Sequence, residues 1–104
     1  MITTIVHFRL PEPITPDVAR EIFSGTAQKY REVPGLIRKY YLISEDGLTA
    51  GGVYLWQSRK DAEAMYTESW NQFVVDKYGT IPSVTYFETS VIVDNAVEEI
   101  IIDN

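Results

Sequence analysis

The chain contains 104 residues and carries a net charge of −6 at neutral pH. This length fits one domain, so we expect residues 1–104 to fold as a single unit. The excess of acidic residues argues against nucleic acids and anionic membranes as partners, because both attract a clustered basic surface. The chain has no cysteine, which excludes disulfides and thiolate metal ligands.

The start of the sequence lacks the basic residues and the long apolar core that are typical of a signal peptide. No apolar run reaches the length that a membrane-spanning helix needs. We therefore expect a cytoplasmic protein that has no membrane segment.

The first part of the chain predicts a strand followed by a helix. Residues 2–10 are rich in β-branched and aromatic side chains, and the prolines that follow would end a strand there. Thr15 suits a helix N-cap and Pro16 suits the first helical position. Apolar residues, Tyr30 among them, then recur every three or four positions, so one face of the helix should pack until it ends at residues 33–35.

The middle of the chain predicts a β-hairpin with arms at residues 36–43 and 48–57. The turn between them is expected at Asp46-Gly47, a pair that is typical of tight hairpin turns. The whole chain is arranged around this hairpin, which runs directly into a second helix.

The turn length decides which side chains of the hairpin share a face. A two-residue turn would pair Tyr41 with Gly52 and place Tyr41, Tyr54 and Trp56 on one face of the sheet, whereas a three-residue loop would reverse that relation. The Gly51-Gly52 pair lies inside a strand and lacks the Gly-Lys-Ser/Thr ending of a phosphate loop. It indicates a bulge or the close approach of a large neighbour.

The second helix is expected to begin after Ser58, with Asp61 completing a short capping box. The polar residues 67–69 predict a kink into a short further helix. Gly79 suits the C-terminal end of that helix.

The last part of the chain predicts one strand and a tail. Residues 83–93 form the longest alternating run, and residues 95–104 are left as a short C-terminal tail. The predicted order is βαββαβ, the ferredoxin-like α+β pattern with an antiparallel four-stranded sheet and both helices on one face.

Both faces of this sheet are predicted to be apolar. Val6 and Phe8 lie on one side of the first strand and Ile5 on the other, and Tyr86 and Phe87 alternate in the same way on the last strand. Leaving about five such side chains in water would forgo ~1.5–3 kcal/mol each, which is comparable to the whole stability of a small domain. We therefore expect a twofold homodimer that buries sheet against sheet, with the C-terminal tail as the alternative cover.

Four short segments stand out together. They are His7-Phe8, then Pro34-Gly35-Leu36-Ile37 with Lys39 and Tyr41, then Ala50-Gly51-Gly52-Val53-Tyr54-Leu55-Trp56, and then Ala62-Glu63-Ala64-Met65-Tyr66. In this combination the chain resembles the YdhR-like mono-oxygenases of the dimeric α+β barrel superfamily, which also contains the antibiotic-biosynthesis monooxygenases. The likeness runs from the first strand to the fourth and does not include the C-terminal tail.

This resemblance implies a homodimeric α+β barrel with a small pocket between sheet and helices in each subunit. It also implies a cofactor-independent monooxygenase, which would oxidise a small phenolic, quinol or polyketide-like aromatic substrate with O₂ and use no metal, flavin or haem.

His7 is the only histidine of the chain, and its ordinary pKa of ~6.5 suits proton transfer near neutral pH. It is the candidate catalytic base, with a purely structural histidine as the alternative, and it would face either the pocket or the dimer interface. A phenol with a pKa of ~10 lies about 3.5 units higher, which corresponds to ~5 kcal/mol. Hydrogen-bond donors aimed at the developing phenolate would have to close much of that gap.

Aromatic residues are the candidate substrate-binding residues, because aromatic walls with a few polar tips suit flat organic ligands. They are Tyr41, Tyr54, Trp56, Tyr66, Trp70 and Tyr86. The alternative is that they form the core and the interface, as aromatic residues of small domains commonly do.

Other site chemistries find little support. One histidine and scattered carboxylates do not make a metal site, and the second helix has no histidine that could bind haem iron. Arg9 and Arg38 could bind an anionic substituent or simply lie on the surface. No serine or threonine has a base at a recognisable motif spacing.

Three classes of function remain open. The first is the cofactor-independent monooxygenase with His7 as base. The second is a non-oxidative isomerase or dehydratase on the same scaffold, since one fold hosts several chemistries. The third is a homodimer that binds a small ligand without turnover.

Overall fold

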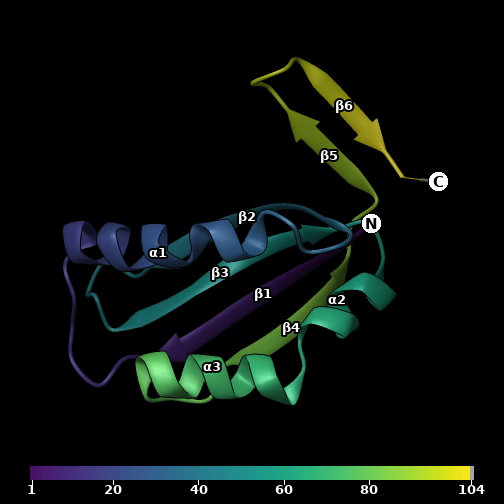
Figure 1. Ribbon diagram of the computed structural model, residues 1–104. Helices are drawn as coiled ribbons and strands as arrows, with labels where there is room; N and C mark the ends of the chain where they lie inside the picture. Colours follow the sequence, from purple (N-terminus) through teal and green to yellow (C-terminus); the bar gives the residue numbers. More distant parts are fainter. Residues whose placement is uncertain (104) are drawn as a thin grey trace.

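The computed structural model describes residues 1–103, which contain a four-stranded sheet, a separate two-stranded sheet and three helices (Figure 1). The elements in chain order are β1 (Ile2–Arg9), α1 (Pro16–Tyr30), β2 (Leu36–Ile43), β3 (Thr49–Trp56), α2 (Arg59–Met65), α3 (Glu68–Tyr78), β4 (Ser83–Glu88), β5 (Val91–Asp94) and β6 (Glu99–Ile102). The larger sheet has the strand order β2-β3-β1-β4, and all neighbouring strands are antiparallel. This order confirms the predicted ferredoxin-like α+β fold.

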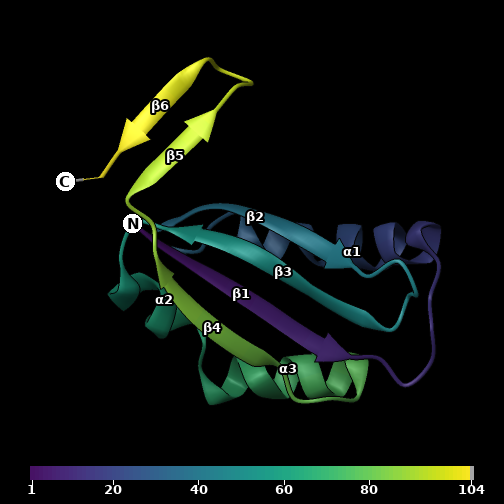
Figure 2. The same ribbon diagram turned by 180° about the vertical axis from the view of Figure 1, so that it is seen from behind.

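The helices cover one face of the four-stranded sheet, as the front and rear views agree (Figures 1 and 2). The side chains of β1 alternate between the two faces of the sheet. Val6 and Phe8 are buried beneath the helices, whereas Ile5 and His7 point to the opposite side. We call that opposite side of the sheet, which no helix covers, the open face.

Side-chain caps fix where the helices begin. Thr15 and Ser58 each accept a hydrogen bond from the backbone N–H three residues further on, as predicted. Thr67 makes the same contact for α3, so the predicted kink divides the second helical segment into α2 and α3. Gly79 ends α3 at a φ of 83°, which glycine adopts without strain. None of the helices within residues 1–103 is long and apolar enough to cross a membrane.

The register of the central hairpin is the first of the two alternatives left open by the sequence, with Tyr41 opposite Gly52. The turn itself is wider than two residues. Ser44 pairs with Thr49, and within the loop the N–H of Gly47 donates to the carbonyl oxygen of Ser44 at 2.9 Å. The loop between the paired residues still holds an even number of residues, so the same side chains share a face.

The prediction of one continuous strand over residues 83–93 is wrong, because β4 ends at Glu88 and β5 begins at Val91. Strand β4 pairs only with β1, and this pairing reaches Glu88 opposite Ile2. Beyond that point one further backbone hydrogen bond follows, from the Thr89 N–H to the Met1 carbonyl oxygen at 2.9 Å, and the ladder then ends. Backbone groups without a partner are costly, so the chain leaves the sheet.

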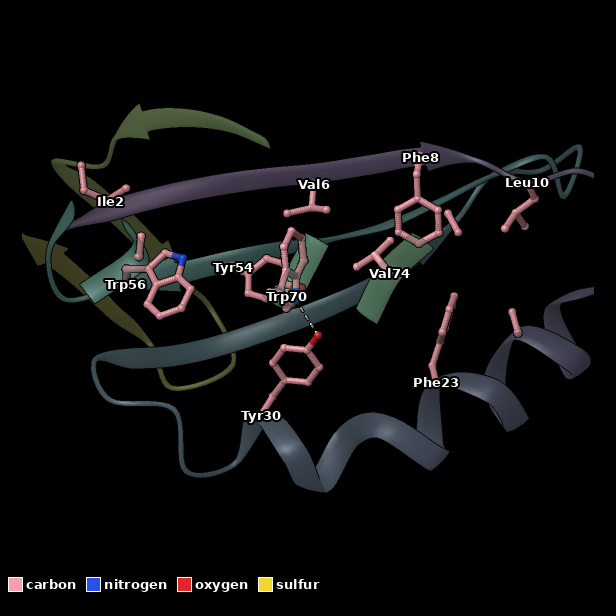
Figure 3. Packing of buried hydrophobic residues seen from close by; sticks show 13 residues of the cluster. Ile2, Val6, Phe8, Leu10, Phe23, Tyr30, Tyr54, Trp56, Trp70 and Val74 are labelled. Carbon is pink, nitrogen blue, oxygen red and sulfur yellow. Dashed lines mark hydrogen bonds between the residues drawn. The ribbon is translucent and has the colours of Figure 1, made fainter. Parts of the chain in front are cut away.

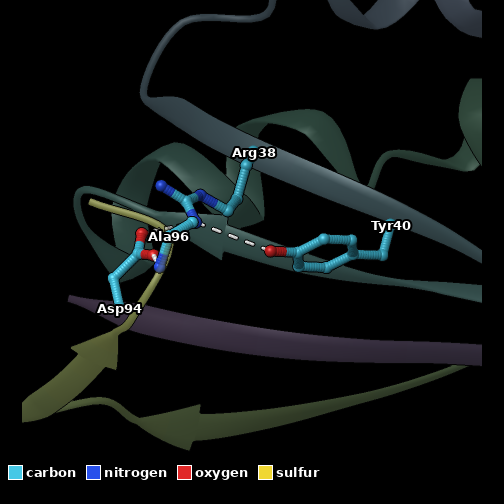
Figure 4. Close-up of polar contacts among 4 residues, drawn as sticks. All are labelled: Arg38, Tyr40, Asp94 and Ala96. Carbon is cyan, nitrogen blue, oxygen red and sulfur yellow. Dashed lines mark hydrogen bonds and ion pairs between the residues drawn. The ribbon is translucent and has the colours of Figure 1, made fainter. Parts of the chain in front are cut away.

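Strands β5 and β6 form a hairpin instead, so residues 99–102 of the predicted tail are a strand. The hairpin projects away from the four-stranded sheet (Figures 1 and 2). Asp94 connects it to β2, since its Oδ2 lies 3.5 Å from Nη1 of Arg38, which also lies 3.5 Å from the Tyr40 hydroxyl (Figure 4). Val93 and Ile100 on the hairpin are 65% and 68% exposed.

The open face carries several exposed apolar side chains. Tyr40 and Leu42 on β2 and Phe87 on β4 are 42–55% exposed. The apolar character that the sequence predicts for this face is therefore present, and the homodimer that would bury it stays a prediction.

Candidate active site

Aromatic side chains fill much of the space between the sheet and the helices (Figure 3). Tyr54 of β3 lies at their centre. Its ring centroid is 6.0 Å from those of Trp56 and Tyr30 and 5.6 Å from that of Tyr66. Trp70 of α3 joins the group at 4.9 Å from Tyr66. The structure thus brings most of the predicted substrate-binding residues into one continuous cluster.

One end of this cluster is closed. Trp56 has no exposed surface, and its Nε1–H donates a hydrogen bond to Oγ1 of Thr4 at 3.0 Å. The same Oγ1 lies 2.6 Å from the Tyr66 hydroxyl. Burial raises the pKa of Tyr66, so its hydroxyl stays neutral. These bonds hold Trp56 and Tyr66 within the core.

Tyr86 of β4 lies at the edge of the cluster. Its ring is 6.2 Å from that of Tyr66, and the guanidinium carbon of Arg59 stands 4.2 Å above it. Burial raises the pKa of Tyr86. The half-buried Tyr86 side chain therefore lies between the cluster and solvent.

Tyr41 of β2 is held against α1. Its ring stacks on Phe23 at 4.9 Å, and its hydroxyl lies 2.7 Å from Oγ1 of Thr26. Because the Thr26 hydroxyl donates to the carbonyl of Phe23, the Tyr41 hydroxyl is the donor to Thr26. The Tyr41 ring is therefore fixed in both position and orientation.

The side chains of Trp70 of α3 and Tyr30 of α1 meet on the helix side of the cluster, where a dashed line joins them in Figure 3. The indole Nε1–H donates to the Tyr30 hydroxyl at 3.1 Å, and both side chains are buried. This hydrogen bond links two helices that lie over the same face of the sheet.

Lys39 of β2 lies beneath that pair. Its Nζ is 3.4, 3.8 and 4.7 Å from the ring centroids of Tyr30, Tyr41 and Tyr54. No carboxylate within residues 1–103 forms an ion pair with it. Burial, and then the positive charge of Lys29, lower the pKa of Lys39 to about 7. The amine can therefore exchange a proton near neutral pH.

Two neighbouring spaces lie on this side of the sheet, an outer pocket and an inner cavity. The outer pocket, about 520 Å³ in volume, lies between the end of α1 and helices α2 and α3, where Lys29 and Met65 help to line it. The inner cavity lies beside Lys39 and measures about 20 Å³, which is room for about one water molecule. Tyr30 and Trp70 border both spaces. Neither space is lined by Trp56, Tyr66 or Tyr86.

His7 is separate from this cluster. It is exposed on the open face, where its neighbours across the ladder are Gly51 of β3 and Ser83 of β4. The sheet itself stands between His7 and Lys39. The structure therefore brings the predicted aromatic residues together but leaves the predicted base on the other side of the sheet.

Metal ligands do not gather anywhere in the described part of the chain, where no three His, Cys, Asp or Glu side chains lie together. The one carboxylate beside the outer pocket, Asp61, accepts a hydrogen bond from the Ser58 hydroxyl at 2.9 Å. What the two cavities offer a ligand is aromatic faces, tyrosine hydroxyls and the amine of Lys39. This chemistry suits an organic molecule with an acidic hydroxyl group.

Lys39 and Tyr30 are not among the predicted site residues, although the sequence pattern indicates which face each of them occupies. Strand alternation places Lys39 on the same face as Tyr41, and helical spacing places Tyr30 on the packing face of its helix. Neither pattern indicates that the two side chains would meet.

The fold and the site together define a small ferredoxin-like α+β protein with a pocket beside a buried aromatic cluster. The family model described as "Putative mono-oxygenase ydhR" matches residues 4–91, and the chain belongs to that family. The match ends where β4 has left the sheet and the β5–β6 hairpin begins.

Solved structures support the fold. The monooxygenase of the ActVA-Orf6 gene of Streptomyces coelicolor, in complex with nanaomycin D, superposes with a TM-score of 0.64 at 20% identity, covering 90% of this chain and 92% of that one. SnoaB, a cofactor-independent oxygenase from Streptomyces nogalater, gives a TM-score of 0.60 at 15% identity over 85% and 91% of the two chains. A comparison with curated proteins gives no match.

Proposed function

We propose that this protein is a cofactor-independent monooxygenase that oxidises a small phenolic, quinol or polyketide-like aromatic substrate with O₂. The observation that carries the proposal is the outer pocket of about 520 Å³ next to the aromatic cluster, in a member of the YdhR family. The reaction would take place between the sheet and the helices of each subunit.

The dimensions of the pocket support a substrate of this kind. Small-molecule sites typically measure about 300–1,000 Å³ and are lined mainly by apolar and aromatic groups with a few polar ones. Trp70 and Tyr30 provide ring surface at the inner wall, and Met65 provides an adaptable apolar contact. A fused aromatic ring system fits such a space.

The chemistry needs no external reductant, because the substrate supplies the electrons. A phenol that becomes a quinone loses two hydrogens and gains one oxygen atom, and the second oxygen atom of O₂ leaves as water. Removal of the phenolic proton comes first, since the anion is much the better electron donor to O₂. The protein's contribution is therefore to bind the ring, promote ionisation and exclude water.

Two groups are candidates for the base that ionises the substrate. The imidazole of His7 can accept a proton, and from the open face it would act on a ligand held between two sheets of a dimer. The amine of Lys39 lies at the inner cavity, next to the proposed substrate pocket. The two candidates make different predictions, which mutation can separate.

We also propose that the protein is a homodimer in which the open faces of two copies pack together. The exposed Tyr40, Leu42 and Phe87 side chains support this arrangement, because burial of such a patch stabilises association. The partner is thus a second copy of the same chain.

The names of two structural neighbours support the substrate class and the lack of a cofactor. The S. coelicolor monooxygenase was solved with the ligand nanaomycin D, and SnoaB is called a cofactor-independent oxygenase. For this chain, both properties are part of the proposal.

Oxygen uptake by the purified, chelator-treated protein tests the proposal. A panel of quinols, anthrones and simple phenols would be supplied under ¹⁸O₂, with product masses measured and heat-denatured protein as the blank. Enzyme-dependent uptake with one ¹⁸O atom in the product is the expected result. Ligand binding that quenches tryptophan fluorescence without any oxygen uptake across the panel would contradict it.

A further inference from the structure

Lys39 is a largely buried cation next to the candidate site that keeps some exposed surface, and its surroundings are unusual for a structural lysine. A buried ammonium is normally paired with a carboxylate, because an unpaired buried charge is costly. Lys39 instead points its Nζ at three tyrosine rings, and no acidic side chain within residues 1–103 is close enough for an ion pair.

We propose that Lys39 binds the acidic hydroxyl of an aromatic substrate, accepts its proton and then holds the resulting oxyanion as an ion pair. The ligand class is a phenol or an enol conjugated to an aromatic ring. This assignment rests on the proposed function, because it names the group that would ionise the substrate of that same site.

The backbone of β3 makes room for the side chain. A Cβ on Gly52 would lie 3.3 Å from Cε of Lys39 and 2.8 Å from the carbonyl oxygen of Tyr40. Glycine at this position therefore lets the lysine stem cross over the sheet. The tyrosine rings then fix the amine beside the inner cavity.

The inner cavity is the right size for the reacting group alone. Its volume of about 20 Å³ holds one oxygen-sized group, whereas the outer pocket of about 520 Å³ holds a ring system. Lys39 also borders a hollow between α1 and β2, but at about 270 Å³ that hollow is below the usual size of a ligand site. We therefore place the ring in the outer pocket and its hydroxyl at the inner cavity.

Entry from the outer pocket requires that Tyr30 and Trp70 separate, since these two residues border both spaces. They are joined by a single hydrogen bond of 3.1 Å between side chains on different helices. A substrate hydroxyl that enters between them can take over the role of hydrogen-bond partner. Entry then involves this bond and the ring contacts of the two side chains with Tyr66 and Tyr41, rather than a change of fold.

The proton transfer is balanced within the pair. The substrate O–H bond breaks, its electrons stay on oxygen, and the proton binds the lone pair of the Lys39 amine. With the pKa of Lys39 at about 7 and that of an ordinary phenol at ~10, this transfer would be unfavourable by about 10³-fold in water. Attraction between ammonium and phenolate in a site closed from water offsets that factor.

The other titratable groups around Lys39 do not compete for this role. Lys29 of α1 adds positive charge, which favours an anion nearby. Burial raises the pKa of Tyr41, Tyr54 and Tyr78, the last to about 12, so these hydroxyls remain neutral. Tyr30 contributes its ring face to the lysine and its hydroxyl to Trp70.

Binding of 4-nitrophenol to the full-length protein under nitrogen tests the inference without any turnover. The phenolate of this dye is yellow and the phenol is colourless, so a pH titration reports the pKa of the bound dye. We expect the wild-type protein to lower that pKa by one unit or more. Lys39→Met should abolish the shift and weaken phenolate binding at least tenfold, whereas the exposed control Lys60→Met should behave as wild type.

Two outcomes overturn the proposal: a folded Lys39→Met variant that still shifts the dye, or a wild-type protein that binds no dye. Failure of the proposed function gives a different pattern, in which wild-type protein ionises the dye in a Lys39-dependent way but consumes no oxygen with the phenol panel.

A second measurement covers the case in which Lys39→Met does not fold. In wild-type protein labelled with ¹³C-lysine, one Cε resonance should titrate near pH 7, and elimination with Lys29→Met, Lys60→Met and Lys77→Met assigns it to Lys39. Saturation with 4-nitrophenol should move this titration to higher pH by one unit or more. A resonance that ignores the dye refutes the ion pair.

Discussion

The indole N–H of Trp70 donates a 3.1 Å hydrogen bond to the hydroxyl of Tyr30. Among the described residues, these two border both the outer pocket and the inner cavity beside Lys39. The two side chains come from α3 and α1, which are far apart in sequence. We expect this pair to affect both the free energy of unfolding and the entry of a ligand from the outer pocket to the inner cavity.

Replacing Tyr30 with Phe removes the acceptor and leaves a buried indole N–H without a partner. An unsatisfied buried donor costs about 1–3 kcal/mol, so the free energy of unfolding should fall by that amount. Tyr40→Phe is the matched control, because Tyr40 is 55% exposed and its effect should stay within about 0.5 kcal/mol. Urea unfolding followed by tryptophan fluorescence measures both, and equal effects would show that the bond has no energetic role.

The stability of the protein should depend on pH through Lys39, whose pKa is lowered from 10.5 to about 7. Between these two values the unfolded chain binds more protons than the folded one, so the free energy of unfolding rises with pH across this window. Below pH 7 the full penalty is present.

Lys39→Met removes that penalty and provides the comparison. The full pKa shift corresponds to roughly 5 kcal/mol, and the tyrosine faces that attract the ammonium offset part of it. We expect the variant to be about 1–3 kcal/mol more stable than wild type at pH 6.5, with the difference shrinking towards pH 10.5. Urea midpoints at several pH values measure this, and a difference that grows with pH would contradict the buried, unpaired lysine.

Two glycines should respond in opposite ways to alanine. Gly25 lies inside α1 with nothing within 4 Å of an added Cβ, so Gly25→Ala should stabilise the protein by about 0.5–1 kcal/mol. Gly52→Ala should instead destabilise it by about 1–3 kcal/mol, because the new methyl group crowds the Tyr40 carbonyl and the Lys39 stem. Thermal unfolding of both variants checks the pair, and a neutral Gly52→Ala would mean that the sheet and the lysine adjust freely.

A charge on the open face should disrupt the homodimer. Phe87→Asp or Leu42→Asp would place a carboxylate in the proposed sheet-to-sheet interface, where burial without a partner is costly, so we expect a monomer or insoluble protein. Val18→Asp is the control, since Val18 is similarly exposed but lies on α1, away from that face. Sedimentation velocity gives the mass in solution, and unchanged dimers in both open-face variants would refute this interface.

His7→Ala separates the two candidate bases. If His7 were the base, its loss would lower turnover by about 10²–10⁴-fold. Because His7 is exposed on the open face, we expect the turnover of His7→Ala to stay within about threefold of wild type. A larger effect is expected only on the affinity between the two subunits of the proposed dimer. Steady-state oxygen uptake beside Lys39→Met distinguishes the cases, and a specific loss of kcat in His7→Ala alone would return the role to His7.

The order of the elements up to β4 and the topology of the four-stranded sheet can be predicted from the sequence alone. Thr15, Ser58 and Gly79 are local signals, since each acts on backbone groups within one helical turn. The pairing of Tyr41 with Gly52 is one of two registers that the sequence allows, because the number of loop residues fixes which side chains share a face. The same alternation separated His7 from Val6 and Phe8.

The end of β4 and the surroundings of Lys39 depend on contacts between distant parts of the chain. Strand β4 ends at Glu88, which pairs with Ile2, the first residue of β1. The alternating pattern of residues 83–93 does not indicate where this pairing ends. The site around Lys39 joins Tyr30, Tyr41 and Tyr54 from α1, β2 and β3. Periodicity tells which residues share a face but not which element covers that face, and the burial that lowers the pKa of Lys39 arises only when these elements pack together.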